Sequence, residues 1–247
     1  MDLKKILFGA VVVIILYIFF TTVFADKTKS NLVGLHNALD NQKEIPYGKL
    51  KGSGSTNYTY SFWIYINDYN KFYGEKKMIL ERSETVGSGA TAKTIYFPRI
   101  YLGENQNDIH IEISEQLDSN NPVTNHDIVI NSIPLQKWNH IIMTKSGNTI
   151  DIYIDGKLVK TSIMPNVAQK PNTESSIKLT KKNESNNKGF AGYLSKVNYY
   201  STAMNTREAY QLYKEGYGDG FLGSFFNRFK LKFAFMQDNQ EKSSIIL

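Results

Sequence analysis

Three stretches of this sequence place an isoleucine or a phenylalanine at every second position. They are Phe62 to Ile66, Ile109 to Ser114 and Ile150 to Asp155. Successive side chains of a β-strand point to opposite faces of a sheet, so a period of two puts one set of side chains into a core and leaves the other set outside it. A chain dominated by such segments is predicted to fold as a β-protein.

Shorter runs of β-branched and aromatic residues predict further strands. They are Lys77 to Arg82, Ile95 to Leu102, Asp127 to Asn131, Trp138 to Lys145, Ser176 to Thr180 and Phe190 to Tyr200. The dipeptide Asp155-Gly156 suits the positive φ angles of a tight hairpin, which would lead into a strand at Lys157 to Lys160. Many short antiparallel strands predict an all-β fold, a two-sheet antiparallel β-sandwich.

One short helix is predicted at Asn205 to Glu215. Ala209, Leu212 and Tyr213 recur there at helical spacing. Asn205 or Thr206 can cap the start of this helix, and Gly216 can end it.

Several segments, taken in order, resemble a known family. They are YTYSFWIYI at Tyr58 to Ile66, the Trp-x-His sequence at Trp138 followed by IYIDGKLV, and the late strand GYLSKVNYY before the helix. Together they resemble the laminin-G-like branch of the concanavalin A-like lectin/glucanase jelly rolls. The resemblance implies one jelly-roll domain over residues 44–218, with these family-motif positions: Phe62, Trp63, Trp138, His140, Tyr153, Asp155, Gly156 and Gly192. It also implies that His140 packs or forms hydrogen bonds beside Trp138.

The chain begins with an apolar segment. Ile6 to Phe24 contains nineteen residues without a charge, among them Ile6, Val12, Ile15, Phe19 and Phe24. A helix of that length spans the hydrocarbon core of about 30 Å, so residues 1–25 are predicted to be a transmembrane anchor. A cleaved signal peptide is the alternative, because Val23-Phe24-Ala25 resembles a cleavage site.

Residues 26–43 are predicted to be a polar stalk, part of which can pair as an edge strand. Lysines flank the anchor on both sides, so the positive-inside rule does not orient it. With this anchor the chain is similar to membrane-anchored proteins of large nucleocytoplasmic DNA viruses that carry the domain. The expected location is therefore a membrane crossed once, which in the viral form is the internal membrane of a virion.

Charge and cysteine content exclude several classes of partner and site. The net charge is +6, but only four of the 29 basic residues are arginine, and carboxylates lie between the lysines. This pattern is not typical of nucleic-acid binding, and no nucleic-acid partner is predicted. The chain has no cysteine, which excludes disulfides, thiolate metal sites and cysteine nucleophiles.

No catalytic constellation is predicted. Retaining glycosidases need two carboxylates about 5 Å apart, but Glu112, Glu115 and Asp118 have the wrong spacing, and Asp151 and Asp155 lie four residues apart. His36, His110, His126 and His140 lack the spacing of a zinc site. Gly87-Ser88-Gly89 lacks the strand-to-helix context of a phosphate loop. The chain is therefore predicted not to be an enzyme.

Calcium is the one cofactor considered, since laminin-G-like domains sometimes bind it at the rim of the sandwich. Glu104, Asn105 and Asp108 lie in an oxygen-rich loop that offers hard ligands. A polar turn between two strands explains the same residues equally well, so no required cofactor is predicted.

The last segment, residues 219–247, is rich in phenylalanine. Phe221, Phe225, Phe226 and Phe229 form a possible contact surface for the sandwich, for a membrane or for another protein. A helical and an alternating strand pattern both fit this segment, and its last eleven residues are expected to be a frayed polar tail.

Two functions compete on these grounds. The first is a non-enzymatic, membrane-anchored module that recognises a glycan or a protein through the loops or an outer face of the sandwich. The alternative is a virion structural protein, a minor capsid component that tethers an internal membrane to the capsid shell. A glycoside hydrolase is a distant third, since glucanases share the fold but this chain lacks their carboxylate motif.

Overall fold

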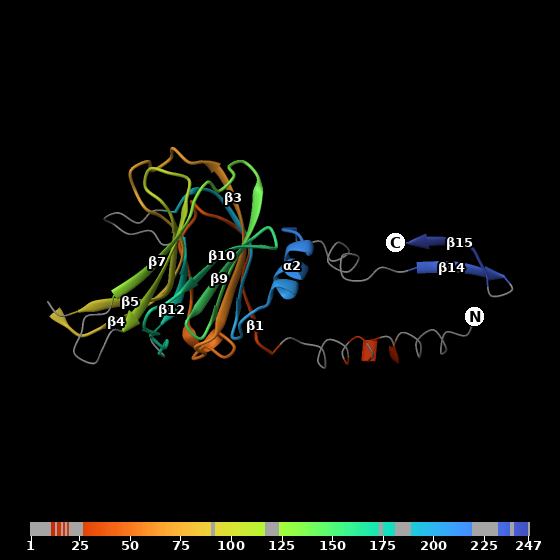
Figure 1. The fold of residues 1–247 in the computed structure, drawn as a ribbon, viewed down its shortest axis with the longest axis horizontal. Coiled ribbons are helices and arrows are strands. Elements are labelled where there is room, and N and C mark those ends of the chain that lie inside the picture. The colour runs from red at the N-terminus through yellow and green to blue at the C-terminus, as the bar shows by residue number, and fades with distance from the viewer. Residues whose placement is uncertain are drawn as a thin grey trace.

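A computed structural model describes residues 11, 12, 14, 15, 17, 19, 27–89, 92–116, 124–172, 175–180, 189–218, 232–237 and 240–246. Two antiparallel sheets pack face to face, as Figure 1 shows. The all-β, two-sheet antiparallel sandwich predicted from the alternation is confirmed.

The first sheet, called sheet A, has six strands in the order β1-β13-β3-β8-β9-β10. Their bounds are β1 Lys29–Asn37, β13 Ala191–Tyr200, β3 Tyr58–Asp68, β8 Trp138–Ser146, β9 Thr149–Ile154 and β10 Lys157–Ile163. The second sheet, called sheet B, has seven strands, with β11-β6-β5-β4-β12-β2 in order and β7 also paired to β6. Their bounds are β2 Lys43–Ile45, β4 Lys77–Val86, β5 Lys93–Leu102, β6 Ile109–Gln116, β7 Thr124–Ile130, β11 Val167–Ala168 and β12 Ser176–Leu179.

The alternating side chains face the sides that the period predicts. Phe62, Ile64 and Ile66 of β3 are fully buried in the main core, which lies between the two sheets. Trp63 and Tyr65 of the same strand face the outside of sheet A, where Trp63 packs against aromatic rings. On β9, Ile150 and Ile152 likewise enter the main core. One face of each strand is thus fixed by burial, which sets the register of sheet A.

The predicted hairpin forms as a two-residue turn. Asp155 and Gly156 have φ angles of 49° and 75°, and Ile154 pairs with Lys157 across the turn. The Asp155 carboxylate accepts a hydrogen bond from the His140 backbone N–H at 2.9 Å. Asp155 is therefore explained by the turn and by its anchoring to β8.

Helix α2, Thr206–Lys214, packs on the side of sheet A that faces away from sheet B (Figure 1). Asn205 caps it: the Asn205 side chain accepts a hydrogen bond from the Glu208 backbone N–H at 3.0 Å, and the Glu208 carboxylate accepts one from the Asn205 N–H at 2.8 Å. Ala209 is fully buried against Ile142 and Tyr153. The helix and its capping residue are confirmed.

Two edge strands close one side of the sandwich. The His126 imidazole and the Ser162 hydroxyl are 2.8 Å apart, and the Lys160 ammonium donates to the Val129 carbonyl oxygen at 3.0 Å. These contacts join β7 of sheet B to β10 of sheet A. They cover an edge that would otherwise be open to pairing with another chain.

Part of the range expected to be a stalk is an edge strand. β1 pairs with β13 along Lys29–Asn37, as the sequence left open. A register shift between Asn31 and Val33 interrupts its alternation, and Leu35 is 65% exposed. An irregular, largely exposed strand has no clean period of two, so its pattern is weak in the sequence.

The described residues test the predictions for the two ends of the chain only in part. Residues 11, 12, 14, 15, 17 and 19 are helical, and Val12, Ile15 and Phe19 are exposed. A search of the described residues finds no helix long and apolar enough to cross a membrane. Ile6 and Phe24 lie outside the described residues, so the anchor stays a prediction.

Phe221, Phe225, Phe226 and Phe229 also lie outside the described residues. Beyond them β14, Lys232–Gln237, pairs with β15, Gln240–Ile246, in a separate two-stranded sheet. The last eleven residues were expected to be a frayed tail, and this is wrong for Gln240–Ile246, which forms a strand. The polar composition of this segment suggested a tail, but its main chain pairs with β14.

Gly192 is predicted to be intolerant of a side chain. An added Cβ would lie 2.0 Å from the Tyr65 carbonyl oxygen, whereas a Cβ at Gly48 meets nothing within 4 Å. Gly192→Ala should lower the free energy of unfolding by about 2 kcal/mol or more, while Gly48→Ala should stay within about 0.5 kcal/mol of the wild type. Urea unfolding followed by tryptophan fluorescence measures both, and an equal effect of the two substitutions would contradict the packing described.

Candidate functional site

Three loops meet at one end of the sandwich and enclose a polar cavity of about 700 Å³, called here the rim pocket. The loops are those between β3 and β4, between β5 and β6, and between β7 and β8. The cavity is lined by Asn67, Asp68, Tyr69, Asn70, Tyr73, Asn105, Gln106, Asn107, Asp108, Asn131, Ser132, Leu135 and Gln136. Amide side chains dominate this lining, and Tyr73 is 62% exposed beside them.

Main-chain hydrogen bonds lock the three loops together. The Gly74 N–H donates to the Glu104 carbonyl oxygen at 3.0 Å, and the Ile133 N–H donates to the Asn107 carbonyl oxygen at 2.9 Å. The Gln136 N–H donates to the Ile66 carbonyl oxygen at 2.8 Å, which ties the third loop to β3. The rim pocket therefore has walls that are organised before any ligand arrives.

Tyr69 lines the pocket, and Lys77 contacts the ring of Tyr69. The Tyr69 hydroxyl donates to the Gly103 carbonyl oxygen at 2.6 Å and also lies against the carbonyl oxygen of Gln106. Burial raises the pKa of Tyr69 to about 12, so the hydroxyl is protonated and donates at neutral pH. The fully buried Lys77 places its ammonium 4.2 Å from the centre of the Tyr69 ring.

Asp108 is the buried carboxylate of the rim pocket. It is 8% exposed, and its Oδ1 atom accepts no hydrogen bond from the described residues. The His110 imidazole is 3.5 Å from that oxygen, so an ion pair forms there when His110 is protonated. Oδ1 is itself buried, whereas the Asp108 side chain as a whole is 12% exposed, so a bound hydroxyl group would meet the other part of this carboxylate.

The loop proposed for calcium is thus part of the rim pocket. Asn105 and Asp108 line it, and Glu104 lines a smaller adjoining cavity of about 340 Å³. Within the described residues, no group of three His, Cys, Asp or Glu side chains lies close enough to hold a metal ion. Calcium ligation and a polar turn thus stay the two interpretations of this loop, and the Glu104 main-chain carbonyl already accepts from the Lys77 ammonium at 3.3 Å.

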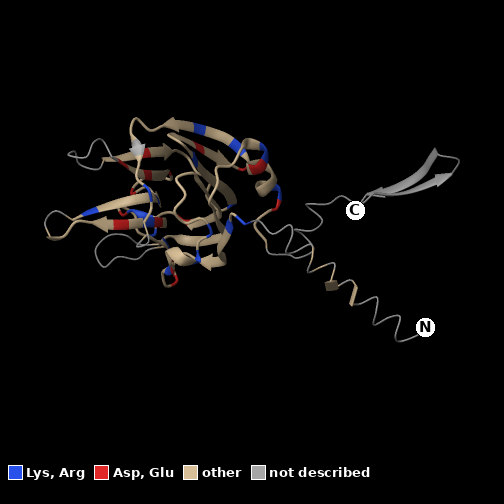
Figure 2. Ribbon diagram, turned by 90° about the horizontal axis from the view of Figure 1, so that it is seen from below, with Lys and Arg blue, Asp and Glu red and all other residues tan. Residues whose placement is uncertain are grey.

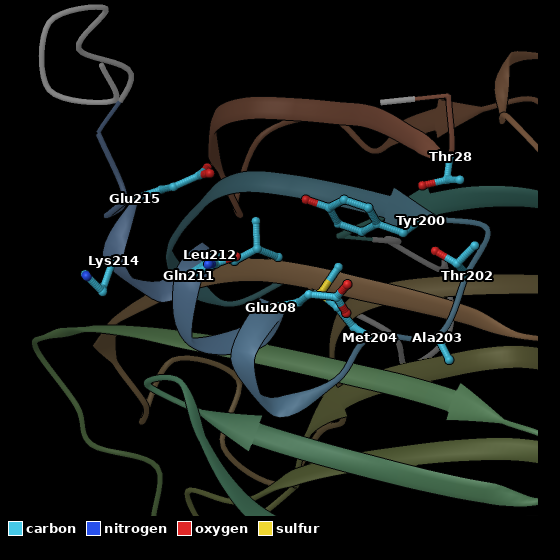
Figure 3. A pocket seen from close by; sticks show the side chains of 10 residues that line it. All are labelled: Thr28, Tyr200, Thr202, Ala203, Met204, Glu208, Gln211, Leu212, Lys214 and Glu215. Atoms are coloured by element: carbon cyan, nitrogen blue, oxygen red, sulfur yellow. The ribbon is translucent and has the colours of Figure 1, made fainter. Parts of the chain in front are cut away.

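A second cavity, of about 450 Å³, lies between α2 and the end of β13 (Figure 3). Its lining residues are Thr28, Tyr200, Thr202, Ala203, Met204, Glu208, Gln211, Leu212, Lys214 and Glu215. It lies beside Thr28, directly before β1, and therefore at the end of the sandwich where the N-terminal segment enters. The one aromatic residue of this lining, Tyr200, is only 4% exposed, and its two acids, Glu208 and Glu215, are not buried.

The family-motif residues gather beneath α2 rather than in a cavity. The Trp63 ring stacks on His140 with centroids 4.7 Å apart and on Tyr213 of α2 at 5.7 Å. Trp138 stacks on Tyr217 at 4.9 Å. His140, two residues from Trp138 on β8, packs on Trp63 because the register of β3 and β8 pairs these two residues. These aromatic residues attach α2 to sheet A.

The glycines of the motif have a packing role as well. A Cβ on Gly156 would lie 3.0 Å from the Tyr210 ring, so the hairpin turn approaches α2 closely. Phe62 belongs to the main core, and the Tyr153 hydroxyl lies 3.5 Å from the Thr206 hydroxyl at the start of the helix. The contacts described for these family-motif residues thus stabilise the fold.

The acids that were weighed as catalytic residues lie apart. Glu112 is 7% exposed on the outer face of sheet B, where it binds the Arg99 guanidinium through Nε at 2.8 Å and through Nη2, and accepts from the Tyr101 hydroxyl at 2.7 Å. Glu115 accepts from the Asn166 N–H at 3.1 Å, and Asp151 from the Thr161 hydroxyl at 2.6 Å. Asp118 lies outside the described residues.

Sequence comparison identifies one family. A profile described as the concanavalin A-like lectin/glucanases superfamily, of laminin G type, matches residues 38–209. No curated protein matches the chain.

Solved structures share the fold at low identity. A mutant of HCR/D is 14% identical with a TM-score of 0.51, and the match covers 72% of this chain and 41% of that chain. The receptor binding domain of botulinum neurotoxin D is 15% identical with a TM-score of 0.46, covering 64% and 36%. The binding domain of botulinum neurotoxin serotype G is 18% identical with a TM-score of 0.48, covering 75% and 46%. The chain thus spans less than half of each of these solved chains, and at such identities the likeness concerns the fold alone.

His140 is predicted to make the protein acid-sensitive. Burial, with a smaller contribution from Lys196, lowers the pKa of His140 from 6.5 to about 3. Between these two pH values the His140 side chain is protonated in the unfolded chain but neutral in the folded chain. The free energy of unfolding therefore falls as the pH drops from about 6.5 towards 3, by up to about 1.4 kcal/mol per pH unit. Urea unfolding at pH 6.5, 5.5 and 4.5 measures this slope.

Two substitutions isolate the contribution of His140. His140→Gln should make the slope shallower, even though it weakens the packing against Trp63. Ser61→Ala removes the hydroxyl that lies 2.9 Å from the imidazole but leaves the ring buried, so it should keep a steep slope. Identical slopes in the wild type and His140→Gln would show that other groups control the acid response.

Proposed function

Because the chain belongs to the concanavalin A-like lectin/glucanases superfamily over residues 38–209, we propose that it is a non-enzymatic, membrane-anchored binding module that takes a glycan in its rim pocket. The buried carboxylate of Asp108 among the amide side chains of that pocket carries the proposal.

The chemistry of the rim pocket suits a sugar. Sugar hydroxyl groups donate and accept hydrogen bonds, and Asn and Gln side chains offer both functions on one group. Asp108 adds an acceptor, and the exposed ring of Tyr73 offers a flat apolar surface against which a pyranose ring can stack. This combination distinguishes the rim pocket from the second cavity beside α2.

The two ends of the sandwich suit a tethered receptor. Lys29 and Thr59 both pair with Tyr200, so the chain enters the sandwich near the start of β3. Asp68, at the end of β3, lines the rim pocket. Nine residues of strand separate Thr59 from Asp68, which corresponds to about 30 Å. An anchor in residues 1–25 would thus leave the rim pocket at the end remote from the membrane.

The proposal that the chain is not an enzyme rests on carboxylates that already take part in contacts of the fold. Glu112 has its oxygens engaged by Arg99 and Tyr101, and Asp155 is part of a turn. A glycosidase needs a pair of carboxyl groups that flank the scissile bond and are free to exchange protons. Basic and acidic residues are interspersed over the sandwich in Figure 2, a distribution that does not favour a polyanion such as nucleic acid.

A protein ligand and a virion tether are the competing forms of the proposal. Both would use exposed surface rather than a sugar-sized cavity, and the virion form would place the anchor in an internal viral membrane. The rim pocket is the observation that favours the glycan.

Rim substitutions should weaken glycan binding. We expect the full-length chain in detergent micelles to bind a subset of a glycan array, with Tyr73→Ala and Asp108→Asn each weakening the hits about tenfold, the effect of losing roughly 1.4 kcal/mol. Tyr210→Ala is the matched control, because Tyr210 is 50% exposed on α2, away from the rim pocket.

Three outcomes would contradict this form of the proposal. An array without hits, or hits that survive both rim substitutions, would favour a protein ligand or an outer face of the sandwich. Hydrolysis of β-glucans that disappears in Glu112→Gln would show that the chain is an enzyme.

Membrane topology gives a second test. A glycan receptor should face the outside or the lumen, where the exposed Asn57 of the sequon Asn57-Tyr58-Thr59 meets the glycosylation machinery. We expect an N-glycosidase-sensitive gel shift in eukaryotic cells that is absent in Asn57→Gln, and a sandwich that is digested by protease added to intact cells or, if lumenal, only after vesicles are opened. An unglycosylated sandwich on the cytosolic side would instead support the shell tether.

A further inference from the structure

Lys77 occupies an unusual position for a lysine, since it is fully buried at the first residue of β4. Its ammonium donates to the carbonyl oxygens of Glu75 at 3.2 Å, Gly103 at 3.2 Å and Glu104 at 3.3 Å. A lysine ammonium has three N–H groups, and these three carbonyl oxygens use all of them. The side chain thus acts as a cation enclosed by main-chain oxygens.

The carbonyl groups that bind Lys77 belong to two of the loops that form the rim pocket. Glu75 is in the loop between β3 and β4, while Gly103 and Glu104 are in the loop between β5 and β6. Converging carbonyl oxygens repel one another unless a positive charge lies between them. The Gly103 oxygen also accepts from Tyr69, and the Glu104 oxygen from the Gly74 N–H, so both loops depend on the same cluster.

Burial lowers the pKa of Lys77, while Glu75, Glu104 and Asp108 oppose this effect. The ring of Tyr69, 4.2 Å from the ammonium, adds a cation–π contact. Both the carboxylates and the ring favour the charged form of the side chain.

We propose that Lys77 is the positioning residue of the rim pocket: its ammonium gathers the carbonyl oxygens of the two loops and so fixes Tyr69, Gln106 and Asp108 for ligand binding without a divalent cation. The inference rests on the proposed function, because it assigns the rim pocket to the ligand. It is the alternative to calcium at the same loop.

The fold contains a matched comparison at the other end of the sandwich. Lys145 is 3% exposed, and its ammonium donates to the carbonyl oxygens of Thr56 at 2.9 Å and Gly147 at 2.8 Å. Removing Lys145 should therefore loosen a different pair of segments. A general effect of losing a buried lysine is thereby separated from a local effect on the rim.

Hydrogen exchange measured by mass spectrometry tests the proposal on the full-length chain, without any glycan. Lys77→Ala should speed exchange in residues 69–76 and 103–108 by at least about tenfold, since hydrogen bonds to a charged group are lost. Lys145→Ala should leave those segments unchanged and act near residues 56 and 147. Lys77→Met, which keeps much of the apolar stem, should loosen the rim as Lys77→Ala does, and serves if the alanine variant fails to fold.

Chemical rescue separates charge from packing. Lys77→Ala removes three carbons and the ammonium, which n-propylammonium replaces, so this ion should restore slow exchange in 103–108, whereas the uncharged n-propanol should not. The wild type should show the same exchange in EDTA and in calcium. Unchanged exchange in both Lys77 variants, equal rescue by n-propanol, or protection of the wild type by calcium would each overturn the proposal.

The two proposals fail in different ways. If exchange behaves as expected but no glycan binds, Lys77 orders the rim and the glycan function is wrong. If glycans bind in the rim pocket but the Lys77 variants exchange and bind like the wild type, the glycan function stands and the role of Lys77 is wrong.

Discussion

The sandwich is organised around three buried cations. Lys77 and Arg82 lie at positions of β4 that point inward, and Lys145 lies on β8; none of the three is more than 3% exposed. An unpaired charge in a protein interior costs several kcal/mol, so each must be surrounded by groups that replace water. All three are held by main-chain carbonyl oxygens and by the faces of tyrosine rings.

The hydrogen bonds of these buried cations connect the core to the loops. Arg82 donates to the Ser53 carbonyl oxygen at 2.7 Å and lies 5.6 Å from the rings of Tyr47 and Tyr199. Its partners thus include the segment that precedes β3, whereas Lys77 holds the loops at the opposite end of that strand. Because a cation binds several oxygens at once, each of these side chains fixes segments that are far apart in sequence. The loops that contain these carbonyl oxygens are consequently tied to the core.

Much of the fold was predictable because its causes are local. The alternation of Phe62 to Ile66 gave the two faces of β3, Asp155-Gly156 gave a hairpin, and Asn205 gave the start of α2. Each depends on backbone preferences or on a period within a few residues. β1 was less visible because its register shift and its exposed Leu35 remove the period.

The candidate site was predictable only in part. Asn105 and Asp108 were singled out as possible oxygen ligands, but Tyr73 and the lining residues from 131 to 136 are more than 20 positions away from them in the sequence. The sequence does not single out Lys77 or Lys145, since nothing near them along the chain indicates that they are buried. The clustering of Asn and Tyr directly after the strand at Phe62 to Ile66 was a signal that could have indicated the rim.

Residues on the two outer faces of the sandwich already take part in contacts of the fold itself. On sheet A, α2 covers Trp63 and His140 with the ring of Tyr213. On sheet B, Arg99 is in register between Glu81 and Glu112, and its guanidinium bonds to Glu112. A substrate that approached this face would have to displace an ion pair whose members are mostly buried, and breaking such a pair leaves an uncompensated charge. The rim pocket instead offers exposed amide side chains, among them those of Asn67, Asn70 and Asn105. Binding at the rim is therefore compatible with the stability of the sandwich, whereas chemistry on either face would work against it.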